Sequence, residues 1–375
     1  MNKELKELLH ILYHIKKSPA EYIRVYRKME GSTALANEFF LKGGCRKYSQ
    51  PGLNAIGPAE PPEDKQYDDI MRGMEKGYFK AIYIGGPDYP HQLENIFSPP
   101  PVLFFRGRKM IDTFNIAIVG SRKCTKYGIE AASYISRSLS AEGITIASGL
   151  ALGIDSIAHR EAIKEKGGSI AILGSGPDII YPPENIGLHD DILGNGTVIT
   201  EFAPGTPPLR KNFPVRNRII SGICSGVIIV EAGRRSGAMI TGEIALSQNR
   251  EVFAVPGSIF SDSSRGCHRL IKNGAKLVEC IEDILEEFQY IFRAQNIKKP
   301  AGGGGAGTGG AKGKKAILTP ENSRIYDNIG YRAISIDALS IRCGVPVKDL
   351  INTLSFLEME ELISEGPSNH YKRSD

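Results

Sequence analysis

Six short runs of apolar, mostly β-branched residues recur at nearly even intervals through the middle of the chain. They begin at residues 116, 144, 170, 197, 227 and 252, so 25 to 30 residues separate one run from the next. Most intervals hold a helix-like stretch, such as residues 127–143 and 155–167. A strand, a crossover helix and the next parallel strand need about this length. Because unbroken apolar strands indicate burial on both faces, the pattern predicts a doubly wound, mostly parallel α/β sheet over residues 80–290.

Apolar residues before this region follow a helical spacing instead. The first helical stripe consists of Leu5, Leu8, Leu9, Leu12 and Ile15. Residues 19–29 predict a second helix, and the Gly- and Pro-rich residues 43–64 then break regular structure. We therefore predict a small helical domain over residues 1–75.

A glycine-dense segment marks the other end of the α/β region. Residues 298–315 contain too much glycine to pack a core, which is typical of a flexible tether. We predict an α/β domain over residues 76–292, a linker over residues 293–316 and a separate tail domain over residues 317–375. The tail shows three helix-like segments and a hairpin, the pattern of a winged helix-turn-helix. Its longest helix carries Lys348 among several acidic residues, so contact with DNA and contact with protein both remain open.

Composition and charge set the broad class. The chain has 375 residues, of which 41% are hydrophobic, and a net charge of +5, which permits an anionic partner without requiring one. The six cysteines form no C-x-x-C pair, so we expect reduced thiols, no metal site and a cytoplasmic protein. The N-terminus lacks the pattern of a signal peptide, and no run of 18 apolar residues predicts a membrane span.

Ligands of a doubly wound sheet bind outside the carboxyl ends of its strands. The first predicted strand ends at Gly120-Ser121-Arg122, followed by Lys123. We expect Gly120 to allow a tight turn and Ser121 to cap the following helix. Exposed N–H groups at a helix start form an anion site, and Arg122 is suited to grip a phosphate with two hydrogen bonds.

The second strand end is glycine-rich. Gly149 and Gly153 allow the backbone to approach a ligand closely, and Asp155 and His159 lie four residues apart on one helix face. A hydrolase would use these two side chains as a catalytic pair. We favour the alternative, a helix cap and a surface contact.

The third strand end gives the strongest nucleic-acid signal. Its cations are Arg210, Lys211, Arg216 and Arg218. No acidic residue occurs between Glu201 and Glu231, and Phe202 and Phe213 interleave with the basic residues. Cations for the backbone and an aromatic ring for base stacking are what single-strand binding requires. The fourth strand end, residues 230–243, is again basic and glycine-rich, with Ser236 and Thr241 placed to cap helices or contact phosphate.

Several cofactor and catalytic signatures are absent from the sequence. The first turn lacks G-x-G-x-x-G, and the second strand ends without the acidic residue that an NAD site uses. No Walker-type G-x-x-x-x-G-K-[ST] and no G-x-S-x-G nucleophile elbow occur. We therefore expect no cofactor and no catalytic residues.

Several long motifs occur together and in a fixed order. They are AIVGSRKCTKYG, SGLALGIDSIAH, YPPEN, FPVRNRIISG, EAGRRSGAMIT, REVFAVPGSI and RGCHRLIKNGAKLV. In these motifs, over roughly residues 80–280, the chain resembles the DNA processing protein A (DprA/Smf) family. The resemblance implies an extended Rossmann-like domain with a helical N-terminal domain and a C-terminal winged helix. It also implies binding of single-stranded DNA without hydrolysis, protection of incoming DNA during natural transformation, loading of the RecA recombinase, and a homodimer through the Rossmann-like domain.

The resemblance also assigns residues. The implied DNA contacts are Gly120, Ser121, Arg122, Lys123, Gly149, Leu150, Gly153, Arg210, Lys211, Phe213, Arg216, Asn217 and Arg218. The implied dimer surface contains His268, Leu270, Ile271 and Leu277. The long glycine-rich linker departs from the shorter connection that is usual in the family.

Two other functions remain as alternatives. Cytokinin-activating phosphoribohydrolases share the broad fold and carry P-G-G-x-G-T-x-x-E after a strand. Here the matching place reads EAGRRSGAMITGE, which retains Glu243 but lacks the glycines. A winged-helix transcription factor with a sensory α/β domain is the third possibility, and the acidic character of the longest tail helix argues against it.

Overall fold

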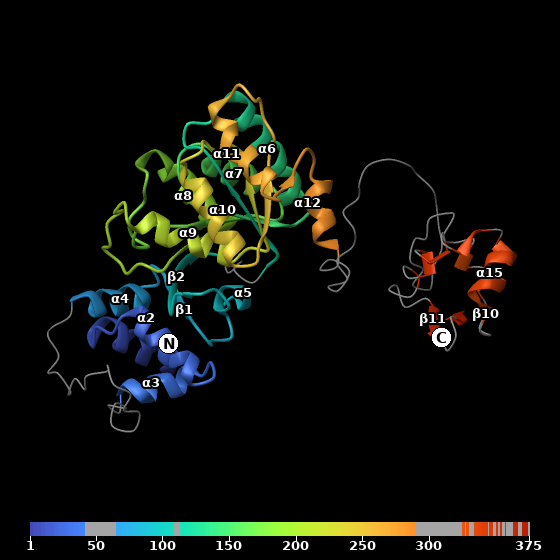
Figure 1. The fold of residues 1–375 in the computed structure, drawn as a ribbon. Coiled ribbons are helices and arrows are strands. Elements are labelled where there is room, and N and C mark those ends of the chain that lie inside the picture. The colour runs from blue at the N-terminus through green and yellow to red at the C-terminus, as the bar shows by residue number, and fades with distance from the viewer. Residues whose placement is uncertain are drawn as a thin grey trace. The chain divides into compact units, whose positions relative to one another are not determined.

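The computed structural model describes residues 1–41, 65–108, 113–289 and, with gaps, 325–373. The chain divides into two compact units, Met1–Pro300 and Ala301–Asp375 (Figure 1). The glycine-rich residues 298–315 lie outside the described residues, so their role as a tether stays a prediction.

Nine strands form one sheet in the first unit, in the order β1-β2-β6-β5-β4-β3-β7-β8-β9. Their bounds are β1 Lys80–Tyr83, β2 Val102–Gly107, β3 Asn115–Val119, β4 Thr145–Ser148, β5 Ser169–Ile172, β6 Gly196–Thr200, β7 Gly226–Ile229, β8 Glu251–Ala254 and β9 Lys276–Leu277. Neighbours from β6 to β9 are parallel, whereas β1 pairs with β2 and β2 with β6 in antiparallel fashion. The six predicted strands are β3 to β8, and the doubly wound, mostly parallel sheet is confirmed. The three remaining strands were not predicted individually.

Helices cover both faces of this sheet. They are α5 (His91–Glu94), α6 (Lys126–Ala141), α7 (Ile154–Ala162), α8 (Ile186–Gly194), α9 (Asn212–Gly222), α10 (Gly237–Ser247), α11 (Arg265–Lys272) and α12 (Glu282–Glu287), with short 3-10 turns at Pro183–Asn185 and Asp262–Ser264. Alternate residues of β3 enter two different buried clusters, Ile116 with α6 and α7, and Ala117 with α9 and α10. This alternation explains why every position of β3 is apolar or buried.

The N-terminal helices belong to the first unit and lie at the β1 edge of its sheet (Figure 1). They are α1 (Lys3–Leu9), a π-helical turn His10–His14, α2 (Pro19–Lys28), α3 (Thr33–Leu41) and α4 (Lys65–Glu75). Ser18 caps α2 by accepting the Glu21 N–H, as expected of serine before a helix-starting proline. Their buried residues share one cluster with β1 and β2, and the Tyr83 hydroxyl of β1 donates to Glu4 at 2.8 Å. Both predicted helices are present, and a domain boundary at residue 75 stays a prediction.

The order of the strands creates a switch point beside β3. The chain runs from β3 through β4 and β5 to β6 on one side, and then returns to place β7 on the other side of β3. The loops after β3, β4 and β7 therefore leave the sheet at neighbouring carboxyl ends. In sheets of this type a ligand crevice forms at that point.

The second unit contains a small three-stranded sheet in the order β10-β12-β11. Its elements are β10 (Ile334–Ser335), α15 (Ile336–Cys343), β11 (Ile363–Gly366) and β12 (His370–Arg373). The predicted hairpin corresponds to the antiparallel pair β11–β12, and Ser335 accepts the Ala338 N–H at the start of α15. Lys348 and the acidic residues of the longest predicted tail helix lie outside the described side chains.

Candidate nucleic-acid interface

Two glycines bring the loops after β3 and β4 into contact. A Cβ atom at Gly120 would lie 2.6 Å from the Ile154 side chain, and one at Gly153 would lie 2.3 Å from the Ser121 carbonyl oxygen. Gly153 also has φ of +79°, a conformation that favours glycine. The Ile154 N–H donates to the Ser121 carbonyl at 3.1 Å. The two loops are thus locked together at the switch point.

The start of α6 differs from the expectation. Its cap is Thr125, which accepts the Gly128 N–H, whereas the Ser121 hydroxyl bonds only within its own turn, to the backbone of Lys123. The buried Glu231 carboxylate after β7 accepts from the Thr125 N–H at 2.9 Å and from its hydroxyl at 2.6 Å. A carboxylate of the protein thus already satisfies this helix start. Predicting Ser121 as the cap was wrong, because the helix begins four residues later.

Glu231, the first residue of the motif EAGRRSGAMIT, has a structural role. A Cβ atom at Gly128 would lie 2.3 Å from its carboxylate, so the glycine makes room for it. Any phosphate at this edge must therefore be held by exposed cations rather than by the α6 N-terminus. Exposed cations in the segment before α6 are Arg122 and Lys123.

Arg216 is buried at 3% exposure, although we expected a solvent-facing cation. Its guanidinium donates to the Gly149 carbonyl at 2.6 Å and to the Ile172 carbonyl, which joins the loops after β4 and β5. A Cβ atom at Gly149 would lie 2.6 Å from that guanidinium. Burial lowers the pKa of Arg216 to about 10, so the group stays charged at neutral pH. The structure gives Arg216 an internal role in shaping the glycine loop.

Asp155 and His159, both on α7, hold the same glycine loop through hydrogen bonds. Asp155 accepts the Gly149 and Ala151 N–H groups at 3.1 and 3.4 Å, and burial raises the pKa of its carboxyl. His159 Nε2 accepts the Leu150 N–H at 3.2 Å, which leaves the proton on Nδ1, 2.7 Å from the Ser169 hydroxyl. Burial lowers the pKa of His159 to about 3. The predicted surface contact for His159 is wrong, since its side chain is fully buried.

An exposed cation lies over an aromatic ring at the rim of this loop. The Arg122 guanidinium is 5.6 Å from the centroid of the Phe213 ring, within the range of a cation–π contact. Tyr181, 40% exposed, places its ring centroid 5.7 Å from that of Phe213. Arg210 and Lys211 are exposed and directly precede α9, which begins at Asn212 and carries Phe213 in its first turn. We call Arg122, Lys123, Tyr181, Lys211 and Phe213 the Arg122 rim.

Arg218 and Leu150 do not belong to the Arg122 rim. Arg218 donates to the Glu201 carboxylate at 2.5 Å, and only 17% of its side chain is exposed. It is five residues after Phe213 on α9, about 140° around the helix. Leu150 is fully buried, while Asn217 is half-buried one turn from Phe213. The structure therefore joins Arg122 to Phe213 and directs Arg218 to an internal ion pair.

The residues that form the sheet and its loops match a known protein family. Residues 80–289 match the model of the family described as DNA recombination-mediator protein A. The chain belongs to this family. Residues 310–369 match the DprA winged helix domain, which confirms the winged-helix prediction for the tail.

Named members of the family cover much of the chain. The chain is 43% identical over 226 residues to DNA processing protein DprA of Streptococcus pneumoniae. The aligned residues make up 60% of this chain and 80% of that protein. The chain is 38% identical over 316 residues to protein Smf of Escherichia coli. Here the aligned residues make up 82% of this chain and 81% of that protein.

Two solved structures of family members share the fold. The X-ray structure of DprA from Streptococcus pneumoniae has a TM-score of 0.55 at 42% identity and covers 59% of this chain and 79% of that chain. The structure of DNA processing protein A from Helicobacter pylori has a TM-score of 0.52 at 27% identity and covers 57% of this chain and 96% of that chain. The latter structure describes the single-stranded DNA binding mode of that protein.

The residues predicted as a dimer surface separate into two groups. Leu270 is 3% exposed and belongs to the core, and Ile271 packs partly against it. Leu277 is 38% exposed, and His268 Nε2 lies 3.0 Å from the carbonyl oxygen of the loop residue Gly257. The burial of Leu270 differs from the expected role, because α11 directs this side chain toward the sheet.

The same loop after β8 presents two unburied apolar side chains. Ile259 is 74% exposed and Phe260 is 91% exposed. The Tyr127 hydroxyl donates to the Pro256 carbonyl at 2.6 Å, which ties the loop to α6. We call Ile259 and Phe260 the Phe260 surface.

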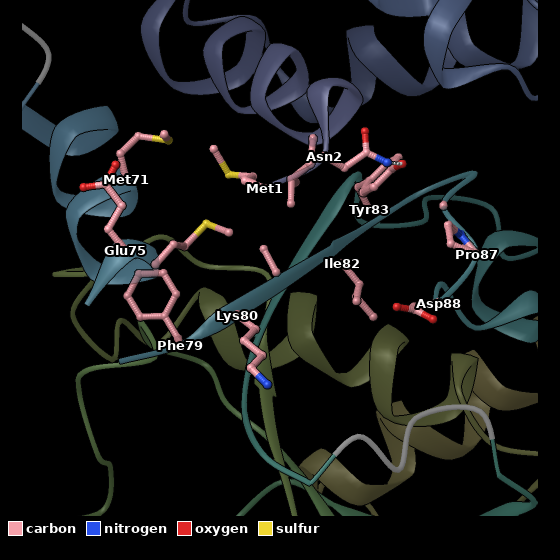
Figure 2. Close-up of a pocket in the computed structure, with 14 residues that line it drawn as sticks. Met1, Asn2, Met71, Glu75, Phe79, Lys80, Ile82, Tyr83, Pro87 and Asp88 are labelled. Atoms are coloured by element: carbon pink, nitrogen blue, oxygen red, sulfur yellow. Dashed lines mark hydrogen bonds between the residues drawn. The ribbon is translucent and has the colours of Figure 1, made fainter. Parts of the chain in front are cut away.

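A separate cavity of about 530 Å³ lies beside β1 (Figure 2). Its lining includes Met1, Met71, Met74 and Phe79, which make it mainly apolar where it faces α1 and α4. None of the Arg122 rim residues lines it. Its lining does not fit a chain of phosphates.

The described residues also bear on metals and membranes. Within the described part of the chain, no group of three or more His, Cys, Asp or Glu side chains is placed to hold a metal ion. Among the helices that the structure describes, none is long and apolar enough to cross a bilayer.

Proposed function

We propose that this recombination mediator binds single-stranded DNA along the Arg122 rim. Support comes from the Arg122–Phe213 pair, which combines a phosphate-gripping cation with an aromatic face for a base. The two acids that border this acid-free stretch are both engaged internally, Glu201 by Arg218 and Glu231 by Thr125. The rim thus has an excess of positive charge. We propose that Gly120, Gly149 and Gly153 contribute by letting the loops below the rim pack closely, since the space of each missing side chain is filled by protein atoms.

The test compares Arg122→Ala with Arg137→Ala, an exposed arginine on α6 outside the rim. Fluorescence anisotropy of labelled oligothymidylate at several salt concentrations gives both the affinity and its salt slope. We expect Arg122→Ala to weaken binding and to reduce the salt slope by about 0.7, the value for one lost phosphate contact on a single strand. Equal affinity and slope in both variants would refute the placement of the strand.

We further propose that binding proceeds without catalysis. In support, Asp155 and His159 are buried and accept backbone N–H groups of the glycine loop, so both hold the loop in place rather than face a ligand. Glu243, the remaining acid of the phosphoribohydrolase signature, is exposed on α10. Incubation with nucleoside monophosphates should release no base, and release of base would favour the hydrolase alternative.

We propose the partners that family resemblance implies. The protein would form a homodimer through the Rossmann-like unit, using His268, Ile271 and Leu277 together with the Phe260 surface, and would protect incoming DNA and load RecA during natural transformation. Exposed apolar side chains clustered in one loop support a protein contact there. RecA loading is tested by the rate of RecA filament formation on DNA coated with single-strand-binding protein, which should rise when this protein is added.

A further inference from the structure

A second basic surface lies on the N-terminal helices. A cavity of about 510 Å³ opens between α2 and the segment after α5. Arg24, Arg27, Lys28 and Phe97 line it, and all four are exposed. Ala20, Ile23 and Ser98 are the other lining residues in the described part of the chain, so the described lining contains three cations and no acid.

Phe97 is 91% exposed, which is unusual for a phenylalanine in an anchored segment. The preceding residue, Ile96, is buried and packs against Gly222 at the end of α9. The Arg27 guanidinium donates to the Ile96 carbonyl at 2.8 Å. The backbone on the N-terminal side of the ring is therefore fixed, and it presents the ring to solvent beside a positioned arginine.

Among the residues that the structure describes, no acid forms an ion pair with Arg24, Arg27 or Lys28, and two acids on the neighbouring helices are engaged elsewhere. Glu21 on α2 pairs with Lys17 at 3.3 Å. Glu94 on α5 accepts a hydrogen bond from the Tyr26 hydroxyl. Arg24 and Lys28 lie one helical turn apart, so both can face the same extended anion.

A bare aromatic ring beside unpaired cations suits a nucleic acid strand. The ring stacks a base and the cations neutralise phosphates, which is how single-strand binders combine the two. An acidic peptide would use the cations but gain little from the ring. The chemistry therefore favours a single strand of DNA over a peptide.

We propose that Phe97, Arg24, Arg27 and Lys28 form a second contact for single-stranded DNA, separate from the Arg122 rim. The identity of the ligand rests on the proposed function. Phe213 lies in the first turn of α9, whereas Ile96 packs on its last residue, Gly222, so about 14 Å of helix separates the two contacts. Only an oligonucleotide longer than one that fills the rim can occupy both.

The experiment measures the affinity of the full chain for a short and a long oligothymidylate by fluorescence anisotropy. The variants are Phe97→Ala, the double variant Arg24→Ala/Lys28→Ala, and Arg122→Ala. Phe97→Ala should weaken the long oligonucleotide roughly tenfold and leave the short one unchanged. The double variant should reduce the salt slope for the long oligonucleotide by about 1.4, which corresponds to two lost phosphate contacts.

The control for Phe97→Ala is Tyr78→Ala, which removes another exposed aromatic ring. The control for the double variant is Arg72→Ala/Lys76→Ala, which removes one exposed cation within α4 and one directly after it. Both controls should bind like the unmodified protein. Wild-type affinity of Phe97→Ala for the long oligonucleotide, with Arg122→Ala still impaired, overturns this inference and leaves the proposed function standing. Absence of binding by the unmodified protein refutes the proposed function itself. Competition by a polyglutamate peptide that depends on Arg24 and Lys28 but not on Phe97 would assign the surface to an acidic peptide and overturn the DNA assignment.

Discussion

The Arg122 guanidinium lies 5.6 Å from the centroid of the Phe213 ring, although 91 residues separate the two in the chain. Arg122 follows β3, and Phe213 lies in the first turn of α9, which follows β6, so the contact joins two segments that come after parallel strands of the sheet. Arg216 lies 5.8 Å from the same ring. Phe213 is thus held between a buried cation and an exposed one, with Tyr181 beside it.

Phe213→Ala should weaken single-strand binding by about 1–3 kcal/mol, because it removes the stacking face and the ring that positions Arg122. Phe213→Tyr keeps an aromatic face and should retain most of the affinity. Anisotropy titrations of both variants with one oligothymidylate measure the difference. Equal losses in the two variants would show that stacking is not what the ring supplies.

Arg216→Ala should lower the free energy of unfolding by about 3 kcal/mol, because two buried carbonyl groups lose their donor and Asp155 loses its nearby positive charge. Arg210→Ala, on an exposed side chain of the same basic segment, should change it by no more than about 0.5 kcal/mol. Urea unfolding measures both. A stable Arg216→Ala protein would contradict the internal role given to this arginine.

Phe260→Ser should shift the protein from dimer to monomer, because it places a hydroxyl in the centre of the Phe260 surface. Phe97→Ser changes an equally exposed phenylalanine on another surface and should leave the oligomeric state unchanged. Sedimentation velocity at several protein concentrations distinguishes the two. A dimeric Phe260→Ser protein would place the dimer contact elsewhere.

Hydrophobic periodicity was enough to predict the sheet. The runs at β3 to β8 are almost entirely buried, so apolar residues dominate them and the polar ones are mostly small. β9 has only two residues, and β1 and β2 join the sheet in antiparallel fashion before the regular repeat begins. Their pairing depends on tertiary contacts that periodicity does not encode.

The candidate site was predictable in residue type but not in side-chain direction. Arg122, Arg216 and Arg218 all read as free cations in the sequence. In the structure Arg122 is exposed, Arg216 bonds to backbone carbonyls, and Arg218 pairs with Glu201. A count of charges does not show which carbonyl or carboxylate will lie within reach once the strands are aligned.

Acid should destabilise the folded state through His159. A histidine in the unfolded chain titrates near pH 6.5, whereas burial and the charge of Arg216 lower the pKa of His159 to about 3 in the folded state. Between these values the unfolded chain binds a proton that the folded chain does not. Stability therefore falls by about 1.4 kcal/mol for each unit of pH lowered through this window, and the contribution is constant above it.

Asp155, which binds the same loop, acts in the opposite direction. Burial raises the pKa of its carboxyl, so the folded state retains a proton at pH values where the unfolded state has lost it. This term adds stability as pH falls from the raised value toward the ordinary one. The histidine contribution must therefore be isolated by substitution.

The variant His159→Gln isolates the contribution of this histidine to the pH dependence of stability. The stability difference between the unmodified protein and this variant should narrow by about 2 kcal/mol between neutral pH and about pH 5, because only the unmodified protein has the histidine slope. Urea unfolding at the two pH values measures it, with the surface variant His91→Gln as the control for loss of an imidazole outside the core. A difference that is the same at both pH values would contradict the buried neutral state of His159.

Substitutions in the Arg218–Glu201 pair distinguish a role in protein stability from a role in DNA binding. Burial raises the pKa of Glu201 and the guanidinium opposes that rise, so removing Arg218 leaves a poorly solvated carboxylate. Arg218→Gln and Glu201→Gln should each lower the free energy of unfolding by about 2 kcal/mol, and the double variant by less than the sum. Urea unfolding of all four proteins gives the coupling energy.

DNA affinity of Arg218→Gln completes this comparison. Because the guanidinium is engaged by Glu201 at 2.5 Å, we expect the loss in stability to exceed the loss in DNA binding. Arg122→Ala should show the reverse order, since its side chain is exposed over Phe213. An Arg218→Gln protein that unfolds like the unmodified chain but loses about 0.7 of its salt slope would instead identify Arg218 as a phosphate contact.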